Sequence, residues 1–344
     1  MDNSIRKYEL MDYIKLLFAL LIVCGHFTSE NPTPTIIKLP FSISAIAVPF
    51  FFTCTGFLCG RSAITNNDSK TVVKRQIKKL FSIYFWWSLI YILFKVLYFI
   101  GNKVDSVEVF QYIYKCFVYT TYATIWYLPA SAIGLLISWK CIELLSVKKA
   151  LFISLFFYLI CIFGYSYSFI LKGTVLEVFY SNYETVFISV RNCLFYAFPF
   201  ITLGWFIAER QHKGITTSFV YFKAFICILL FICEALLLKK IGNTRGSETL
   251  IMHLLTSYYL VVMSIQSKIK TPENFSVYAR KMSTLVFLSQ RIFLTGIPAI
   301  IPFIYNNLFS KWYLGLLCVL ICTVSLSMII LLLSKRFTFL KRLF

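Results

Sequence analysis

The chain has 344 residues, of which 59% are hydrophobic and only 14% are charged, and its mean hydropathy is +0.77. This composition excludes an ordinary soluble domain and indicates an integral membrane protein. The formal net charge of +20 at pH 7 is compatible with a nucleic-acid partner, but it is equally expected of a membrane protein whose inner loops are basic.

Ten apolar segments are each about long enough to cross a membrane as a helix. They cover residues 10–28, 39–60, 80–100, 121–145, 150–170, 191–209, 218–238, 249–266, 283–305 and 313–334. We therefore predict an all-α, polytopic integral membrane protein with about ten transmembrane helices. The longest polar stretches, 61–79 and 267–282, are too short for a folded domain. Residues 1–344 are thus predicted to form a single membrane domain, with no soluble domain.

The distribution of basic residues predicts the orientation. With an even number of spans and both termini cytoplasmic, the inner segments hold 20 of the 34 Lys and Arg residues and the outer loops hold 8. This asymmetry follows the positive-inside rule. It explains most of the net charge, so the expected partner is the lipid bilayer and no nucleic acid is predicted. The richness in Ile, Lys, Phe and Asn favours a bacterial source, and we predict a multi-pass protein of the plasma (cell) membrane.

The first span contains three ionisable residues, Asp12, Lys15 and His26. Ionisable groups are costly in hydrocarbon, so we expect them to face a cavity and to have a function. At about 100° per residue, Lys15 and His26 lie within ~20° of one helix face, and Asp12 lies about 40° from His26. This stripe predicts a catalytic site, with a buried packing histidine as the alternative. His26 is predicted toward the outer half of the span and Lys15 toward the inner half.

Two of the first spans resemble a known family. Lys15, ten intervening residues and His26 resemble the Arg/Lys-x10-His signature of the acyltransferase 3 family. In the second span, AVPFFFTCTGFLCGRS is similar to a family segment that ends before a basic residue, here Arg61. Thr55 stands where the family usually has Ser, which preserves a hydroxyl group.

Two later spans extend the resemblance over nearly the whole chain. In the fourth span, TIWYLPASAIG resembles a family segment through Trp126 and Tyr127. In the sixth span, RNCLFYAFPFITLGWFIAER is similar to another family segment through Arg191 and Asn192. Four such segments in the right order favour membership of the acyltransferase 3 family.

The ninth span departs from the family pattern. In MSTLVFLSQRIFL, Gln290 occupies the place of a second histidine and is followed by Arg291. His26 is then the only histidine in a predicted span that aligns with the chemistry of the family. Arg291 lies deep enough to need an acidic partner, and Glu234 in the seventh span is the predicted one.

The resemblance implies a membrane O-acyltransferase that uses cytoplasmic acyl-CoA, most simply acetyl-CoA, as donor. The acceptor would be a hydroxyl of an exported polysaccharide, an exopolysaccharide, an envelope glycan or a lipid-linked sugar, and polysaccharide biosynthesis proteins are potential partners. An imidazole with a pKa near 6.5 suits proton abstraction from a hydroxyl at neutral pH. The rise from Lys15 to His26 is about 16 Å, comparable to the reach of a pantetheine arm.

The predicted site has three groups of residues. The predicted catalytic residues are His26, Lys15 and Asp12. Because CoA carries several phosphate charges, its site should be basic and cytoplasmic. The predicted CoA-binding residues are Lys15, Arg61, Lys74 and Arg75, and Lys78 and Lys79 belong to the same basic cluster. The predicted acceptor-binding residues are Trp126, Tyr127, Arg191, Asn192, Gln290 and Arg291. No metal site is predicted.

Several interpretations remain open at this stage. The chain is also compatible with a membrane carrier or flippase of lipid-linked sugars that uses the polar stripe as a proton relay, or with a family member that transfers succinyl. The basic stretch after the second span is also expected as a positive-inside anchor. Trp126 and Tyr127 can pack or bind, and the aromatic outer segments 102–120 and 171–190 can form a headgroup belt or cover a sugar pocket.

Overall fold

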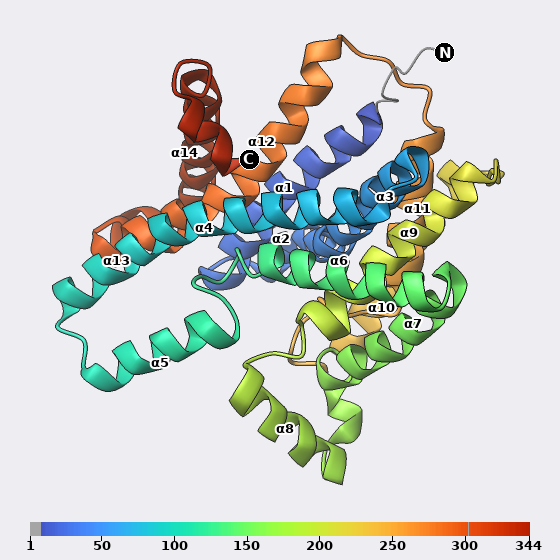
Figure 1. Cartoon of the computed structure of the whole chain (residues 1–344). Helices are drawn as coiled ribbons and strands as arrows, with labels where there is room; N and C mark the ends of the chain where they lie inside the picture. Colours follow the sequence, from blue (N-terminus) through green and yellow to red (C-terminus); the bar gives the residue numbers. More distant parts are fainter. Residues whose placement is uncertain (1–7, 302) are drawn as a thin grey trace.

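A computed structural model describes residues 8–301 and 303–344 (Figure 1). These residues form helices, turns and loops without any strand, which confirms the all-α prediction for this part of the chain. The helices are α1 (Glu9–Glu30), α2 (Thr35–Phe41), α3 (Ala47–Asn66), α4 (Ser69–Asn102), α5 (Ser106–Val118), α6 (Tyr127–Leu144), α7 (Val147–Gly164), α8 (Val175–Phe187), α9 (Phe198–His212), α10 (Val220–Ile241), α11 (Met252–Gln266), α12 (Glu273–Arg291), α13 (Ile297–Ile300) and α14 (Trp312–Leu333).

Eight helical segments among the described residues are long and apolar enough to cross a membrane. They are Glu9–Glu30, Thr35–Asn66, Ser69–Asn102, Tyr127–Leu144, Val147–Gly164, Val220–Ile241, Asn274–Ile300 and Trp312–Leu333. Each overlaps one of the ten predicted spans. The sixth and eighth predicted spans form the shorter helices α9 and α11, of 15 residues each. The count of ten spans and the cytoplasmic placement of the termini remain predictions.

Polar caps inside the bundle set where α9 and α11 begin. Before α9, the chain makes a π-helical turn, and Asn192 Oδ1 accepts hydrogen bonds from the N–H groups of Leu194 (2.9 Å) and Phe195 (3.0 Å). Before α11, the carboxylate of Glu234 accepts from the N–H groups of Ile251 and Met252, each at 2.8 Å. A carboxylate at a helix N-terminus is electrostatically favourable. Both helices therefore start several residues later than hydropathy alone predicts.

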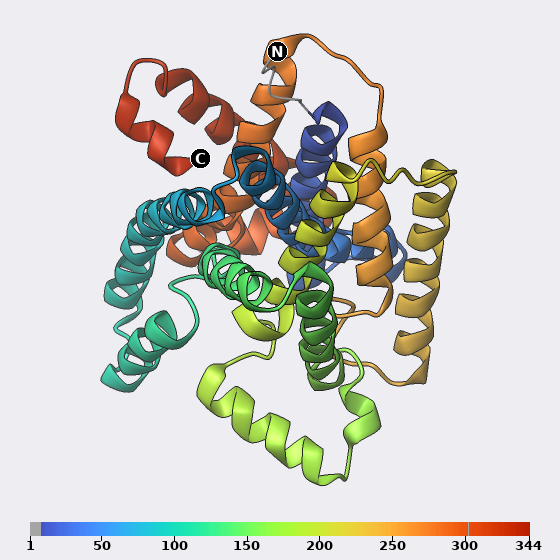
Figure 2. The ribbon, with the colours of Figure 1, turned by 45° about the vertical axis from the view of Figure 1, so that its right-hand side comes forward.

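The two ends of the bundle differ in what they expose. Figure 2 shows the start of α1 and the C-terminus at one end, and α5 and α8 at the opposite end. The first end carries the basic start of α4, where Asp68 caps the helix by accepting a hydrogen bond from Thr71 N–H at 3.0 Å. This bond holds the pKa of the exposed Asp68 carboxyl below its usual value. We call this end the basic end.

The predicted outer segments 102–120 and 171–190 contain the helices α5 and α8, each with an exposed apolar face. The large exposed apolar side chains are Val107, Phe110, Ile113, Tyr114 and Phe117 on α5, and Val175, Leu176, Val178, Phe179, Val186 and Phe187 on α8. Amphipathic helices of this kind are stable at the headgroup level of a membrane, where the apolar face is buried toward the acyl chains. The arrangement favours the belt interpretation for most of these side chains.

Helices α3 and α9 cross with their backbones in close contact, because a glycine of each helix lies against the backbone of the other. A Cβ at Gly56 would lie 2.0 Å from Ile201 O, and a Cβ at Gly204 would lie 2.2 Å from Thr53 O. Small residues at helix crossings allow such backbone contact in membrane proteins. Gly56 and Gly204 therefore fix the position of α3 at the centre of the bundle.

The Gly56→Ala variant is expected to lower the free energy of unfolding by roughly 1–3 kcal/mol, because the added methyl group forces the two backbones apart. Thermal unfolding of the purified chain in detergent measures the effect. Gly101→Ala is the matched control, since a Cβ there meets nothing within 4 Å and alanine favours the helix. Equal stability of the two variants would contradict the close crossing.

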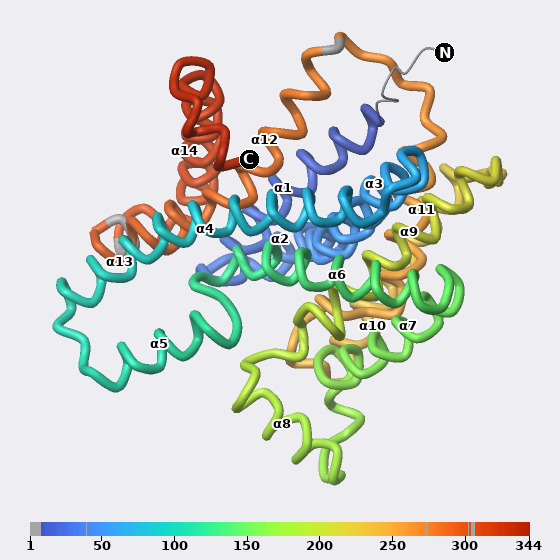
Figure 3. Tube along the Cα trace, in the orientation of Figure 1, coloured from blue at the N-terminus to red at the C-terminus, as the bar shows by residue number. Residues whose placement is uncertain are grey.

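Three contacts position the helices around the site. Helices α1 and α12 lie side by side and run in the same direction, joined at one end by Ser276 Oγ, which donates to Asp12 Oδ2 at 2.8 Å. Helices α4 and α6 also run side by side, as the trace in Figure 3 shows. The C-terminal segment packs against α4, where Trp87 Nε1 donates to Leu343 O at 3.0 Å. These contacts enclose a space between α1, α3, α4, α6 and α12.

Candidate active site

The polar stripe of α1 serves two different cavities. Lys15 lines a cavity at the basic end, and His26 lines a second cavity on the far side of the bundle. Asp12 does not line the cavity of His26. It is buried against α12, where its Oδ2 lies 3.7 Å from Arg280 Nε. Of the three predicted catalytic residues, the structure thus brings only His26 to the second cavity.

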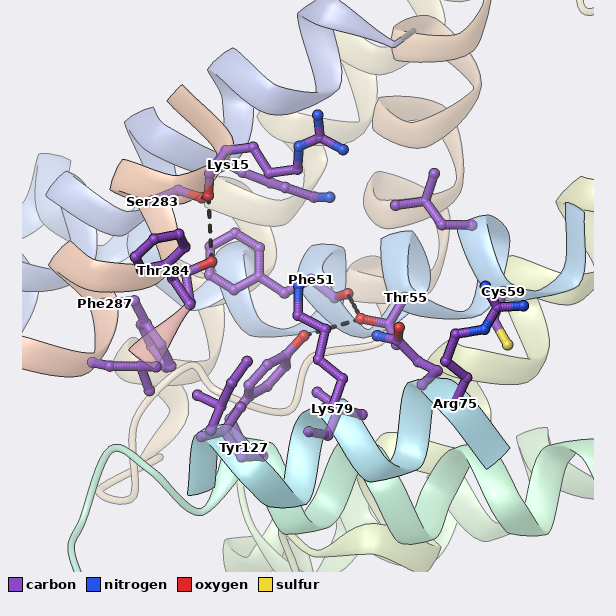
Figure 4. A pocket seen from close by; sticks show the side chains of 18 of the residues that line it. Lys15, Phe51, Thr55, Cys59, Arg75, Lys79, Tyr127, Ser283, Thr284 and Phe287 are labelled. Carbon is purple, nitrogen blue, oxygen red and sulfur yellow. Dashed lines mark hydrogen bonds between the residues drawn. The ribbon is translucent and has the colours of Figure 1, made fainter. Parts of the chain in front are cut away.

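The first cavity, which we call the basic cavity, has a volume of about 420 Å³. Four cationic side chains line it: Lys15, Arg75, Lys79 and Arg280. Figure 4 shows Lys15 on one side of it and Arg75 and Lys79 of α4 on the opposite side. No Asp or Glu is among its described lining residues, while Ser62, Thr55, Gln76, Ser283 and Thr284 supply polar groups. A cavity with four cations and no acid favours a polyanion.

The predicted CoA-binding residues divide into two pairs. Lys15 and Arg75 line the basic cavity, as expected for such a role. Lys74 is exposed on α4 and does not line it. Arg61 lies elsewhere, with its guanidinium 4.9 Å from the centre of the Tyr8 ring in a separate small cavity. Lys79, from the basic cluster that the sequence predicts at the CoA site, also lines the cavity, and the structure adds Arg280, which the sequence analysis did not assign to the site.

The second cavity, which we call the His26 cavity, has a volume of about 750 Å³. Its aromatic lining residues are Phe41, Tyr119, Trp126, Tyr165, Tyr196 and Phe287, and its cationic ones are Lys38, Lys115, Arg191, Arg245 and Arg291. Glu184 and Glu248 also line it. The predicted residues Trp126, Arg191 and Arg291 therefore share one cavity with His26.

A chain of polar contacts holds His26. Arg291 Nη2 lies 3.0 Å from His26 Nδ1, and Arg291 Nη1 donates to both carboxylate oxygens of Glu30 at 2.6 and 2.7 Å. A guanidinium has only donors, so Nδ1 of His26 accepts and the neutral ring carries its proton on Nε2. The acidic partner of Arg291 is Glu30 and not Glu234, which caps α11. That part of the sequence prediction was wrong.

Three packed aromatic rings lie where the two cavities adjoin. Phe287 lines both of them, and the centre of its ring lies 5.9 Å from that of Phe51 and 5.7 Å from that of Tyr127. The Phe51 and Tyr127 rings are 6.1 Å apart, and Tyr127 Oη lies 3.2 Å from Thr55 Oγ1. We call these three rings the ring partition. Tyr127 lies at the basic cavity, whereas its neighbour Trp126 lines the His26 cavity.

Two predicted acceptor-binding residues have structural contacts instead. Asn192 caps the turn before α9, and its Nδ2 donates to Tyr183 Oη at 2.8 Å. Gln290 is buried, and its Nε2 donates to Phe287 O in its own helix at 2.8 Å. Neither is among the described lining residues of the two cavities. The structure therefore brings Arg291, the residue after Gln290, to His26.

Arg280, which the sequence analysis missed, has a detectable signal. It lies eleven positions before the predicted residue Arg291 on α12, the same spacing as Lys15 and His26 on α1. Because the two helices are parallel neighbours, one residue of each pair lines each cavity. No group of three His, Cys, Asp or Glu side chains that could hold a metal ion occurs within residues 8–301 and 303–344.

Comparison with known proteins finds three curated relatives, all racemases by name. Two amino-acid racemases of Enterococcus faecalis are 33% identical over 230 residues (65% of this chain, 31% of the relative) and 26% identical over 346 aligned positions (95% and 46%). A serine/alanine racemase of Enterococcus gallinarum is 25% identical over 220 residues (60% and 30%). The chain spans less than half the length of these relatives.

No solved structure matches the chain. The model of the acyltransferase 3 family, described as an acyltransferase domain, matches residues 8–332. This match covers nearly the whole chain and confirms the resemblance drawn from its motifs: the chain belongs to the acyltransferase 3 family.

Proposed function

We propose that the chain is a membrane O-acyltransferase that moves an acyl group, most simply acetyl, from acyl-CoA to a hydroxyl group of a glycan. The observation that carries this proposal is the pair of cavities on either side of the ring partition. One cavity has four cations and no acid, and the other has His26 and a wall of aromatic side chains. We assign the donor to the basic cavity and the acceptor to the His26 cavity.

The basic cavity suits the nucleotide end of CoA. The phosphate groups of CoA would be held by Lys15, Arg75, Lys79 and Arg280. Guanidinium and ammonium groups bind phosphate through charge-assisted hydrogen bonds. The pantetheine arm would then run along α1 toward His26. The rise from Lys15 to His26 is about 16 Å, which such an arm can span. The ring partition lies across this path, so passage of the thioester requires its rings to move.

The reaction needs a proton acceptor at the His26 cavity. The acceptor hydroxyl oxygen attacks the thioester carbonyl carbon, the carbon–sulfur bond breaks, and an ester and CoA thiolate form. The hydroxyl proton passes to His26 and from there to the sulfur. Because Arg291 occupies Nδ1 of His26 in this structure, the hydroxyl must first displace Arg291 Nη2, while Nη1 stays bound to Glu30.

Glu30→Gln is expected to lower kcat by about tenfold, because an uncompensated Arg291 charge disfavours the protonated His26 ring beside it. Steady-state kinetics with acetyl-CoA measure the effect. Glu177→Gln at the start of α8 is the control, since this exposed carboxylate lies outside the His26 cavity. An unchanged kcat in Glu30→Gln would contradict the proposed part of Glu30.

The experiment that tests the function is acyl transfer by the purified full chain in lipid nanodiscs. Radiolabelled acetyl-CoA is incubated with sugar acceptors, and mass spectrometry detects the acetylated product. Product formation supports the acyltransferase. A carrier or flippase of lipid-linked sugars, the main alternative, would instead move its substrate in vesicles without forming any ester. The expected setting is the plasma membrane of a bacterium, beside the enzymes that make the polysaccharide.

A further inference from the structure

The cations of the His26 cavity are not equally compensated. Arg245 forms a bidentate pair with Glu184, with nitrogen–oxygen distances of 2.9 and 2.7 Å. Arg291 is also paired, because its Nη1 donates to both carboxylate oxygens of Glu30. Arg191, in contrast, has no carboxylate within 4.0 Å among the described residues. Among the described residues, Arg191 is therefore the guanidinium of this cavity that lacks a direct ion pair with a carboxylate.

The surroundings of Arg191 orient this guanidinium but compensate its charge only in part, through an electrostatic interaction with Glu248 that is not a direct ion pair. Its Cζ lies 4.5 Å from the centre of the Tyr165 ring, and its Nε is buried without a hydrogen-bond partner. Glu248 lines the same cavity, yet its Oε2 is also buried and unpartnered. A cation withdrawn from water is costly unless a ligand or a counter-ion repays the lost hydration.

The other walls of the cavity suit a sugar ring. The rings of Tyr119 and Trp126 are stacked, with centres 6.2 Å apart and planes at 14°. The Tyr196 ring lies 6.1 Å from Trp126. Aromatic faces stack on the apolar faces of sugars, whereas a neutral sugar gives Arg191 no counter-charge. Lys38 and Lys115 add further positive charge to the lining.

We propose that the acceptor is an anionic glycan, whose carboxylate or phosphate group binds to Arg191 while its hydroxyl lies at His26. The planar fork of a guanidinium matches both oxyanions. Held in this way, the anionic group fixes which hydroxyl of the acceptor reaches the histidine. The inference rests on the proposed acyl transfer, and it assigns the negative charge to the acceptor rather than to the acyl group.

The test compares pairs of acceptors in which one neutral group, a hydroxymethyl or a hydroxyl, is replaced by a carboxylate or a phosphate. The purified full chain in nanodiscs receives acetyl-CoA with galacturonate or galactose, and with glycerol 3-phosphate or glycerol. We expect kcat/KM to favour the anionic member of at least one pair by about 10- to 100-fold. The pair that shows the preference identifies the group as carboxylate or phosphate. In Arg191→Gln the ratio of kcat/KM for the anionic and the neutral acceptor falls toward one, and Arg191→Lys retains part of the preference.

The control is Lys103→Asn, which removes a cation from the same end of the molecule but outside the cavity. Lys103 has a φ of 50°, a conformation that asparagine tolerates. This variant is expected to keep the full preference. The inference is overturned if the wild-type chain prefers neither anion, or if the preference survives in Arg191→Gln. It is also overturned if Arg191 instead selects succinyl-CoA over acetyl-CoA.

A second measurement separates this inference from the proposed function. If no acceptor is acylated, the acyl-transfer proposal fails, and binding is read from the thermal unfolding midpoint of the chain. Galacturonate or glycerol 3-phosphate should then raise the midpoint of the wild-type chain and not of Arg191→Gln. If Arg191 is only a partner of Glu248, Arg191→Gln and Glu248→Gln are both destabilised and neither anion raises the wild-type midpoint. That result overturns the inference.

Discussion

Replacing His26 with alanine is expected to lower the rate of acyl transfer by about 10²- to 10⁴-fold, the usual contribution of a positioned proton acceptor. His26 is the histidine that lines the larger cavity, and Arg291 and Glu30 hold its ring in place. The substitution leaves the basic cavity intact. The loss should therefore be in kcat, and the KM for acetyl-CoA should stay near its wild-type value.

His212→Ala is the matched control for this prediction. His212 is exposed at the end of α9, away from both the basic cavity and the His26 cavity. We expect this variant to keep full activity and the same elution profile in gel filtration as the wild-type chain. Comparable kcat values for the His26→Ala and wild-type chains would exclude a chemical role for His26.

The double variant Arg75→Gln, Arg280→Gln is expected to raise the KM for acetyl-CoA by about 100-fold. Each side chain supplies a charged contact in the basic cavity, and a hydrogen bond to a charged group contributes about 1.5–3 kcal/mol. The remaining cations, Lys15 and Lys79, should preserve weak binding. The effect of salt on KM should also diminish, because fewer screened charges attract the donor.

Lys74→Gln provides the control for the basic cavity. Lys74 is the neighbour of Arg75 and carries the same charge, but it is exposed and lies outside the lining. If CoA binding depends on the cations that line the cavity, Lys74→Gln leaves the KM for acetyl-CoA nearly unchanged. An equal rise of KM in Lys74→Gln and Arg75→Gln would mean that the basic end attracts the donor only as a diffuse positive surface.

The sequence predicted the class of fold and one half of the site because these depend on local patterns. Runs of apolar residues predict spanning helices, and the spacing of Lys15 and His26 predicts a common helix face. The start of α9 depends instead on the Asn192 cap, and the start of α11 on a carboxylate from α10. Caps supplied by single polar side chains leave little trace in hydropathy.

The composition of the site could not be predicted where it depends on the packing of neighbouring helices. The partner of Arg291 is Glu30, at the end of α1, and only the parallel arrangement of α1 and α12 brings them together. The same arrangement places Arg280 in the basic cavity. Gln290 and Arg291 are neighbours in sequence but point to different surroundings, which depends on the rotation of α12 about its axis.

The division of the site into two cavities could also not be predicted from the sequence. The motif residues Trp126 and Tyr127 are adjacent in the chain, but Trp126 lines the His26 cavity, whereas Tyr127 lines the basic cavity and belongs to the ring partition. Phe51 and Phe287 complete the partition from two other helices. Contacts among rings that are far apart in the chain can be identified only from a structure.

The central claim is that donor and acceptor enter from opposite ends of the bundle and meet at His26. The most direct test uses vesicles in which the chain has one known orientation. Acetyl-CoA is supplied on the side of the C-terminus, and galactose and galacturonate are enclosed on the other side. We predict acetylated sugar on the side opposite the donor, and none with His26→Ala. Acetylation only when donor and acceptor share one side would contradict the account.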